Sequence, residues 1–142
     1  MKDFWESKEI RERVIVENEL AFAFPTNIPI VPGHTLICPK RRVALLDEVS
    51  TEEWLAMMEM RKKLKKAMKK AFGAEGFNYA WNEGEAAGQS VPHVHLHMLP
   101  RKKGDAGVYG YEPRKFLYRP GSRVESPQKK LVEVAESIRL GL

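Results

Sequence analysis

The sequence predicts a mixed fold in which about five short strands accompany one long helix and a C-terminal helix. Short apolar segments of strand length cover residues 14–16, 20–24, 34–39 and 77–81, and a histidine-rich stretch covers 88–101. A longer amphipathic pattern with helical spacing follows Ser50 and continues to Phe72. A length of 142 residues suits a single domain rather than two independent ones.

Local signals define the elements before the long helix. Residues 3–13 have a helical pattern, and the side chains expected to be buried there are Phe4, Trp5 and Ile10. The strands at 14–16 and 20–24 are separated by three polar residues, so they are expected to form a hairpin. Three prolines make residues 25–33 a stiff loop, because each proline fixes its own φ angle.

The long helix is the most clearly marked element. Ser50 and Glu53 have the spacing of a capping box, and Gly73 follows the last apolar residue. The side chains at helical spacing that we expect to face the core are Trp54, Met57, Met58, Leu64, Met68, Ala71 and Phe72.

After the long helix, residues 77–81 predict a strand that turns through 82–84 and returns in the histidine-rich strand. These two strands are expected to pair. A tyrosine- and arginine-rich stretch, 109–123, is expected to be a surface loop. Ser126 and Pro127 then begin a terminal helix, whose apolar residues are Leu131, Val134, Ala135 and Ile138.

Composition limits the classes of function. The net charge of +5 favours anionic partners, but the basic run 61–70 is expected to be a solvated helix face, so nucleic acid is not an expected partner. The apolar runs are too short to span a membrane, and no signal peptide is recognisable at the N-terminus, so we expect a cytoplasmic protein without a membrane partner. The lone Cys38 lies between apolar residues and is expected to be a buried thiol rather than a nucleophile.

Three of the four histidines alternate with apolar residues in the histidine-rich stretch. Side chains alternate between the two faces of a strand, so His93, His95 and His97 are expected to project from one face. Three neighbouring imidazoles that titrate near neutrality would repel one another unless an anion, a metal or a reaction stabilises them. The pattern therefore predicts a functional site suited to a chain of phosphates.

A zinc site is the main alternative from the residues themselves, because imidazoles two positions apart on a strand can converge on a metal. The residues that approach the histidines are Gly84, Gly88, Gln89 and Ser90, which supply hydrogen-bond donors rather than carboxylate ligands. We therefore expect a phosphate site and no resident metal.

The histidine-rich segment resembles the signature of the histidine triad family, in which three histidines alternate with hydrophobic residues. The match extends over NEGEAAGQSVPHVHLH at 82–97 and PIVPGHTLICPKR at 29–41, and the resemblance covers residues 20–101. Residues 102–142 would then be a tail and helix within the same single domain, 1–142. The Pro-Gly-His and LPRKKGD segments resemble the fragile histidine triad branch of diadenosine polyphosphate hydrolases, whereas NEGxxxGQSV resembles the nucleoside phosphoramidases.

The resemblance implies an α+β fold, in which a long helix packs on an antiparallel sheet of about five strands, and a homodimer. It makes His95 the nucleophile that attacks the α-phosphorus of a nucleotide, with the His93 carbonyl fixing its tautomer. His97 would bind phosphate and deliver a proton to the leaving group, and His34 would support the triad from the neighbouring strand. Donors to the phosphoryl oxygens would be Asn82, Gln89 and Ser90.

The resemblance also places the base and the ribose in a pocket formed by the region from Phe22 to Ile28, with Leu36 and Ile37 nearby. Family members usually bind the ribose through Asp or Asn in this loop. In this sequence Thr26 aligns with that position and Asn27 follows it, so either residue could contact the ribose.

The implied function is nucleotidyl transfer or hydrolysis at the α-phosphate of a nucleoside polyphosphate, with a diadenosine polyphosphate as the expected substrate. A phosphorylase and a nucleoside phosphoramidase are the variants within the family. A noncatalytic nucleotide sensor or RNA-associated module is the alternative of another class. No cofactor is expected, although a divalent cation could accompany the substrate phosphates.

Overall fold

The computed structural model describes residues 6–89, 91–105 and 125–142. Within these residues one antiparallel sheet has the strand order β1-β2-β3-β5-β4. The helices and strands in chain order are α1 (Lys8–Arg13), β1 (Val16–Glu17), β2 (Ala21–Pro25), β3 (Thr35–Pro39), η2 (Leu46–Glu48), α2 (Thr51–Phe72), β4 (Gly76–Trp81), η3 (Glu85–Ala87), β5 (Leu96–Arg101) and α4 (Gln128–Arg139). The expected α+β fold, and the pairing of β4 with the histidine-bearing strand, are confirmed.

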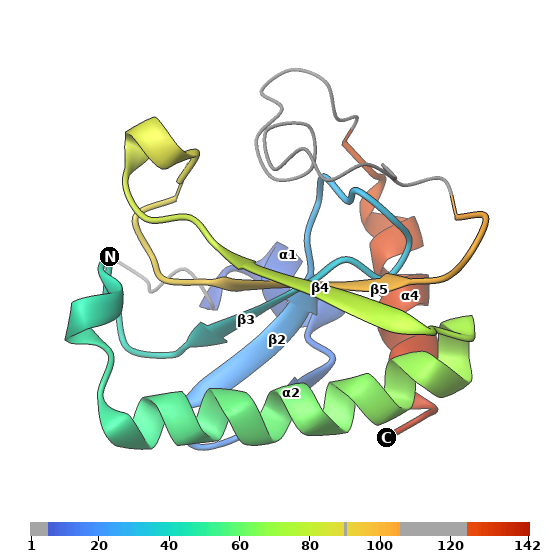
Figure 1. The fold of residues 1–142 in the computed structure, drawn as a ribbon, viewed down its shortest axis with the longest axis horizontal. Coiled ribbons are helices and arrows are strands. Elements are labelled where there is room, and N and C mark those ends of the chain that lie inside the picture. Colours follow the sequence, from blue (N-terminus) through green and yellow to red (C-terminus); the bar gives the residue numbers. More distant parts are fainter. Residues whose placement is uncertain (1–5, 90, 106–124) are drawn as a thin grey trace.

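The long helix α2 runs along one face of the sheet (Figure 1). Its buried side chains are Met57, Met60, Leu64, Ala67 and Met68. They pack in one core cluster with the strand residues Ala21, Ala23, Ile37, Leu96 and Met98. The strand residues alternate along the chain because side chains of one parity share one face of a sheet.

The start of α2 has the predicted capping box. The Ser50 hydroxyl accepts from the Glu53 N–H (3.1 Å), and the Glu53 carboxylate accepts from the Ser50 N–H (2.9 Å). The carboxylate also accepts two hydrogen bonds from Arg41, which hold the pKa of Glu53 below its usual value. Gly73 adopts the left-handed conformation that closes the helix, at a φ of 64°.

The opposite face of the sheet carries α1 and the candidate site. A second cluster on this side contains Ile10, Phe22, Phe24, Leu36 and Cys38. The sheet register pairs His97 with Leu36 on one side and with Ala80 on the other, so His97 projects from this same face. Cys38 is fully buried, as predicted, and its burial raises the pKa of the thiol far above the usual range.

Two members of the predicted helix stripe lie outside the core: Ala71 is only half-buried, and Trp54 is exposed. Its side chain is 42% exposed and stacks on Trp81, with ring centroids 5.6 Å apart. Trp54 belongs to the first turn of α2, near the edge strand β4, and only one side of the indole is covered there. Met60, which the sequence did not single out, is almost fully buried.

The N-terminal elements are shorter than predicted. α1 begins at Lys8 because Ser7 caps it, its side chain accepting from the Ile10 N–H; Phe4 and Trp5 lie outside the described residues. Ile10 is buried, as expected. The predicted hairpin forms between β1 and β2, and the Asn18 side chain closes its turn by accepting from Leu20 and Ala21.

The tyrosine- and arginine-rich stretch 109–123 lies outside the described residues. Among the residues that are described, no helix has the length and apolarity needed to cross a membrane.

Candidate active site

The histidines do not all project from one strand face, so that prediction is wrong. β5 begins only at Leu96, and the preceding backbone bends, with the His93 N–H donating to the Val91 carbonyl (2.7 Å). His93 therefore turns into the protein, where it is 2% exposed and its Nε2 donates to the Pro39 carbonyl (2.7 Å). Strand alternation requires an extended backbone, and the chain departs from it before Leu96.

His95 has a tautomer fixed by its backbone contact. Its Nδ1 lies 2.8 Å from the carbonyl oxygen of His93, the contact that the family resemblance implies. A carbonyl only accepts, so Nδ1 carries the proton and Nε2 has a free lone pair. Burial lowers the pKa of His95, and its hydrogen bond to the His93 carbonyl offsets this only in part. A neutral imidazole with an available Nε2 is a nucleophile.

His97 has the opposite tautomer, which follows from two further hydrogen bonds. The Ile30 N–H donates to Nδ1 of His34 (3.0 Å), so the proton of His34 is on Nε2. That Nε2 lies 2.9 Å from Nδ1 of His97 and donates to it. The proton of His97 is therefore on Nε2. We call these contacts the Ile30–His34–His97 hydrogen-bond chain.

The two rings stand side by side with complementary atoms. The centroids of His95 and His97 are 5.0 Å apart, at an interplanar angle of 65°. His95 presents a lone pair at Nε2, and His97 presents an N–H at the same ring position. A nucleophile beside a hydrogen-bond donor suits displacement at a centre that carries anionic oxygens, such as a phosphoryl group.

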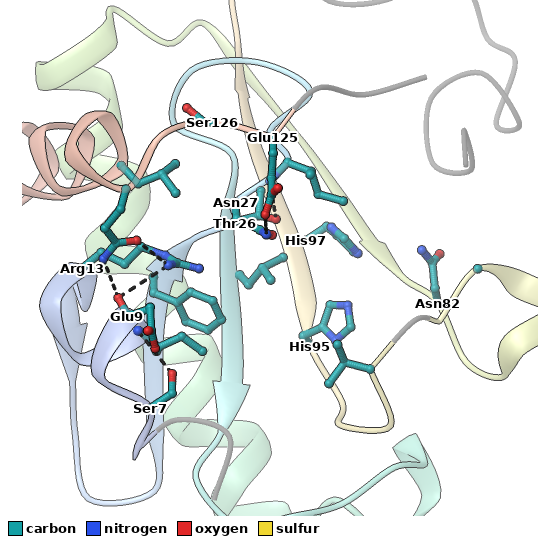
Figure 2. A pocket seen from close by; sticks show the side chains of 18 residues that line it. Ser7, Glu9, Arg13, Thr26, Asn27, Asn82, His95, His97, Glu125 and Ser126 are labelled. Carbon is teal, nitrogen blue, oxygen red and sulfur yellow. Dashed lines mark hydrogen bonds between the residues drawn. The ribbon is translucent and has the colours of Figure 1, made fainter. Parts of the chain in front are cut away.

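Both histidines line a cavity of about 720 Å³, which is within the usual size of small-molecule sites. Figure 2 shows its polar groups in order from α1 to the histidines: Ser7, Glu9 and Arg13, then Thr26, Asn27 and Glu125, then His97, His95 and Asn82. The apolar part of the wall is formed by Ile10, Phe24, Ile28, Leu36, Val91 and Leu131.

Several predicted residues do line this cavity. Asn82 lies at its histidine end, and Ile28 lies in its apolar wall. Thr26 is buried and its hydroxyl accepts from the Ile28 N–H (3.4 Å), whereas Asn27 is exposed and its Nδ2 donates to Glu125 (2.9 Å). Asn27 is therefore the more accessible of the two candidates for the ribose.

Two predicted nucleotide contacts are not found at the cavity, and a third lies outside the described residues. Phe22 is fully buried beside Phe24, with ring centroids 5.4 Å apart, and Phe24 lines the cavity in its place. The Gln89 side chain accepts from the Gly84 N–H (2.8 Å) and donates to the Ala44 carbonyl (3.2 Å), so it holds its own loop. Ser90 is the residue outside the described part of the chain.

The sequence did not indicate the wall built from both ends of the chain. Glu9 and Arg13 come from α1 and Ser7 from its N-cap, whereas Glu125 and Ser126 precede α4 and Gln128 begins it. No local pattern marks these residues, because a polar side chain on a short amphipathic helix is typical of solvent exposure. Arg13 and Gln128 form a hydrogen bond (2.8 Å) although 115 positions separate them.

The described residues contain no group of three or more histidine, cysteine or acidic side chains that could hold a metal ion. All four histidines make the hydrogen bonds described above, to carbonyl oxygens, to one another and to the Ile30 N–H.

Comparison with known proteins identifies the family. A model of the HIT domain matches residues 7–104. The chain belongs to the HIT family. A bis(5'-adenosyl)-triphosphatase of Dictyostelium discoideum is 35% identical over 95 residues, which cover 67% of this chain and 64% of that protein. An asymmetrical bis(5'-nucleosyl)-tetraphosphatase of Schizosaccharomyces pombe is 36% identical over 96 residues, covering 68% and 53%. The chain thus spans less than two thirds of the length of these two relatives.

Solved HIT structures share the fold over nearly the whole chain. A Hit-like protein involved in cell-cycle regulation from Bartonella henselae superposes with a TM-score of 0.74 at 30% identity, and the match covers 92% of this chain and 86% of that one. The match therefore extends beyond residues 7–104, to which the domain model is limited.

We expect the pKa of His95 in the folded protein to lie below the ordinary histidine value of 6.5, because burial disfavours the charged ring. The ring would then stay neutral at more acidic pH than a free histidine. Titration of the histidine ring protons by NMR measures this, with His95→Asn to assign the signal and urea-unfolded protein as the reference. A midpoint in the folded protein at or above that of the unfolded one would contradict the expectation.

Proposed function

We propose that this HIT protein is a nucleotide hydrolase or nucleotidyl transferase that acts at the α-phosphate of a nucleoside polyphosphate, with a diadenosine polyphosphate as substrate. The observation that carries the proposal is the pair of opposite tautomers at one end of the cavity, a free Nε2 on His95 beside an Nε2–H on His97. Relatives named as a triphosphatase and a tetraphosphatase of dinucleotides support the choice of substrate.

The proposed reaction has two displacements at phosphorus. Nε2 of His95 attacks the α-phosphorus, and the bond to the bridging oxygen breaks, so the electron pair leaves with the departing phosphate chain. The nucleotidyl-imidazole carries positive charge, which the Nδ1–H stabilises through its hydrogen bond to the His93 carbonyl. Water then attacks phosphorus, the P–N bond breaks, and a proton from the water is released as neutral His95 returns.

The Ile30–His34–His97 hydrogen-bond chain defines what His97 contributes. While both hydrogen bonds persist, Nδ1 of His97 accepts, and the ring has a single proton on Nε2. His97 can donate a hydrogen bond to a phosphoryl or bridging oxygen, but it has no second proton that would allow full transfer. The proton delivery expected from the resemblance is therefore replaced by neutral hydrogen-bond donation.

This proton count favours phosphoanhydrides over phosphoramidates as substrates. A phosphate leaving group is stable as an anion, whereas an amine must be protonated before it departs. The phosphoramidase variant therefore has less support from the geometry than the polyphosphate hydrolase. No resident metal forms part of the proposal, although a divalent cation could neutralise the substrate phosphates.

A product panel tests the proposed function. We expect diadenosine triphosphate to give AMP and ADP with water as acceptor, faster than adenosine phosphoramidate is cleaved. Parallel reactions with inorganic phosphate separate a phosphorylase, which would form ADP in place of AMP, and reactions with and without Mg²⁺ test the cation. Binding of every compound without turnover would refute the enzyme proposal and favour a nucleotide sensor.

Substitution of the two histidines should separate bond formation from stabilisation. We expect His95→Ala to lower kcat by at least about a thousandfold while nucleotide affinity is largely kept, since the other cavity groups remain. We expect His97→Ala to lower kcat by about a hundredfold, the usual cost of a lost oxyanion donor. For His97→Ala, the loss should be similar for good and poor phosphate leaving groups. A loss that grows with leaving-group basicity would show that His97 delivers a proton.

We also propose a homodimer that forms through the β4 edge. β4 lies at one end of the strand order, and its Tyr79 is exposed beneath the Arg61 side chain of α2, 5.4 Å from the ring centroid. The stacked Trp54 and Trp81 extend this aromatic surface. Exposed apolar surface along an unpaired strand edge is typical of an interface.

Light scattering should give a mass of twice 16.3 kDa for the wild type at micromolar concentration. Tyr79→Glu should shift the protein towards the monomer by placing a charge in the interface. Leu140→Glu, at an exposed position beyond α4, is the matched control and should remain dimeric. A monomeric wild type would contradict the assembly without affecting the proposed chemistry.

A further inference from the structure

Arg13 is a buried cation at the end of the cavity farthest from the histidines (Figure 2). Its side chain is fixed on two sides: Nε donates to the Pro25 carbonyl (2.9 Å), and Nη1 donates to the Gln128 side-chain oxygen (2.8 Å). The guanidinium also lies over the Phe24 ring, 5.5 Å from its centroid. These contacts join α1, β2 and α4 around a single side chain.

The hydrogen-bond acceptors of this guanidinium are neutral groups, and the Glu9 carboxylate acts on its charge without forming a hydrogen bond to it. Its acceptors are the carbonyls of Pro25 and Glu9 and the amide of Gln128, and it forms no ion pair with a carboxylate among the described residues. Within that part of the chain, Nη2 has no acceptor either. Burial lowers the pKa of Arg13, and the Glu9 carboxylate offsets this only in part. A buried charge that is only partly compensated beside a cavity suggests that a ligand group completes its coordination at Nη2.

The surroundings of Arg13 suit a flat heteroaromatic ring. Ile10, Phe24, Leu36 and Leu131 form the apolar wall next to it, and the cavity continues from there to His95. With the α-phosphate at His95, the ribose would lie beside Asn27 and Glu125, and the base of the same nucleotide would reach the α1 end (Figure 2). The base edge would then face Arg13.

We propose that Arg13, aimed by Gln128, donates from Nη2 to an acceptor atom on the edge of the nucleobase, so that the pocket selects bases with such an acceptor over flat rings that only stack. The proposal rests on the proposed function, because the α-phosphate at His95 sets the position of the base. A ring without an edge acceptor would leave the guanidinium desolvated and unsatisfied, which is how a polar site rejects an analogue that lacks the matching group.

The test compares AMP with indole riboside 5'-monophosphate, which keeps the fused ring, ribose and phosphate but has no acceptor on the ring edge. Calorimetry on the full chain should show AMP binding about tenfold to a hundredfold more tightly to the wild type, as expected for a hydrogen bond from a charged donor. In Arg13→Met, which keeps an unbranched side chain but lacks the guanidinium, this ratio should fall to about threefold or less. Arg11→Met is the matched control on the same helix, where Arg11 pairs with Glu17 (2.7 Å) outside the cavity lining, and it should keep the wild-type ratio.

Equal affinity of the wild type for the two nucleotides would overturn the proposal without any variant. An unchanged ratio in Arg13→Met would also overturn it, because the discrimination would come from another group. Should Arg13→Met fail to fold in a thermal melt, Gln128→Leu keeps the guanidinium and removes the acceptor that aims it, together with the hydrogen bond from Gln128 Nε2 to the Glu9 carbonyl (2.8 Å). A reduced ratio supports the proposal and an unchanged one contradicts it. The binding ratio is independent of turnover, so an inactive protein that keeps the ratio would refute the proposed reaction and leave the role of Arg13 standing.

Discussion

The candidate site depends on one backbone donor, the Ile30 N–H that bonds to Nδ1 of His34. This hydrogen bond fixes the proton of His34 on Nε2, and His34 in turn fixes the proton of His97 on Nε2. His95 is set the other way by the His93 carbonyl. Two neighbouring histidines thereby acquire different chemistry: a main-chain carbonyl sets His95 directly, and a main-chain N–H sets His97 through the side chain of His34.

The fold serves to hold these main-chain groups in position. The proline-rich loop carries Ile30 next to β3, and the pairing of β3 with β5 brings His34 beside His97. Gly33 precedes His34 at a φ of 93°, and a Cβ there would approach the Phe72 ring to 2.7 Å and the Pro100 ring to 2.9 Å. A side chain at this position would therefore push the loop away from α2 and β5, and with it the donor that orients His34.

The features that the sequence predicts well are those that depend on residues close together in the chain. The capping box of α2, the left-handed Gly73 and the hairpin all depend on residues a few positions apart, and each is present. Phe22 and Phe24 share one face of β2, so the alternation of side chains could not show which of them lines the cavity. In the structure Phe24 lines it, and Phe22 is fully buried in the same cluster. His93 and Gln89 were misjudged because the backbone bends before β5 and because Gln89 satisfies its own loop. The wall containing Arg13 and Gln128 depends on a contact across 115 positions, which no local pattern encodes.

The central claim is that Nε2 of His95, and no other atom of the site, forms a covalent bond to phosphorus. The most direct measurement is to mix the protein with a dinucleotide labelled at the α-phosphate, quench within the first turnover and map the labelled peptides. We expect label on His95, labile in acid and stable in alkali, as is typical of a phosphorus–nitrogen bond. Label on another residue, or a burst of free nucleotide with no labelled protein at any quench time, would contradict it.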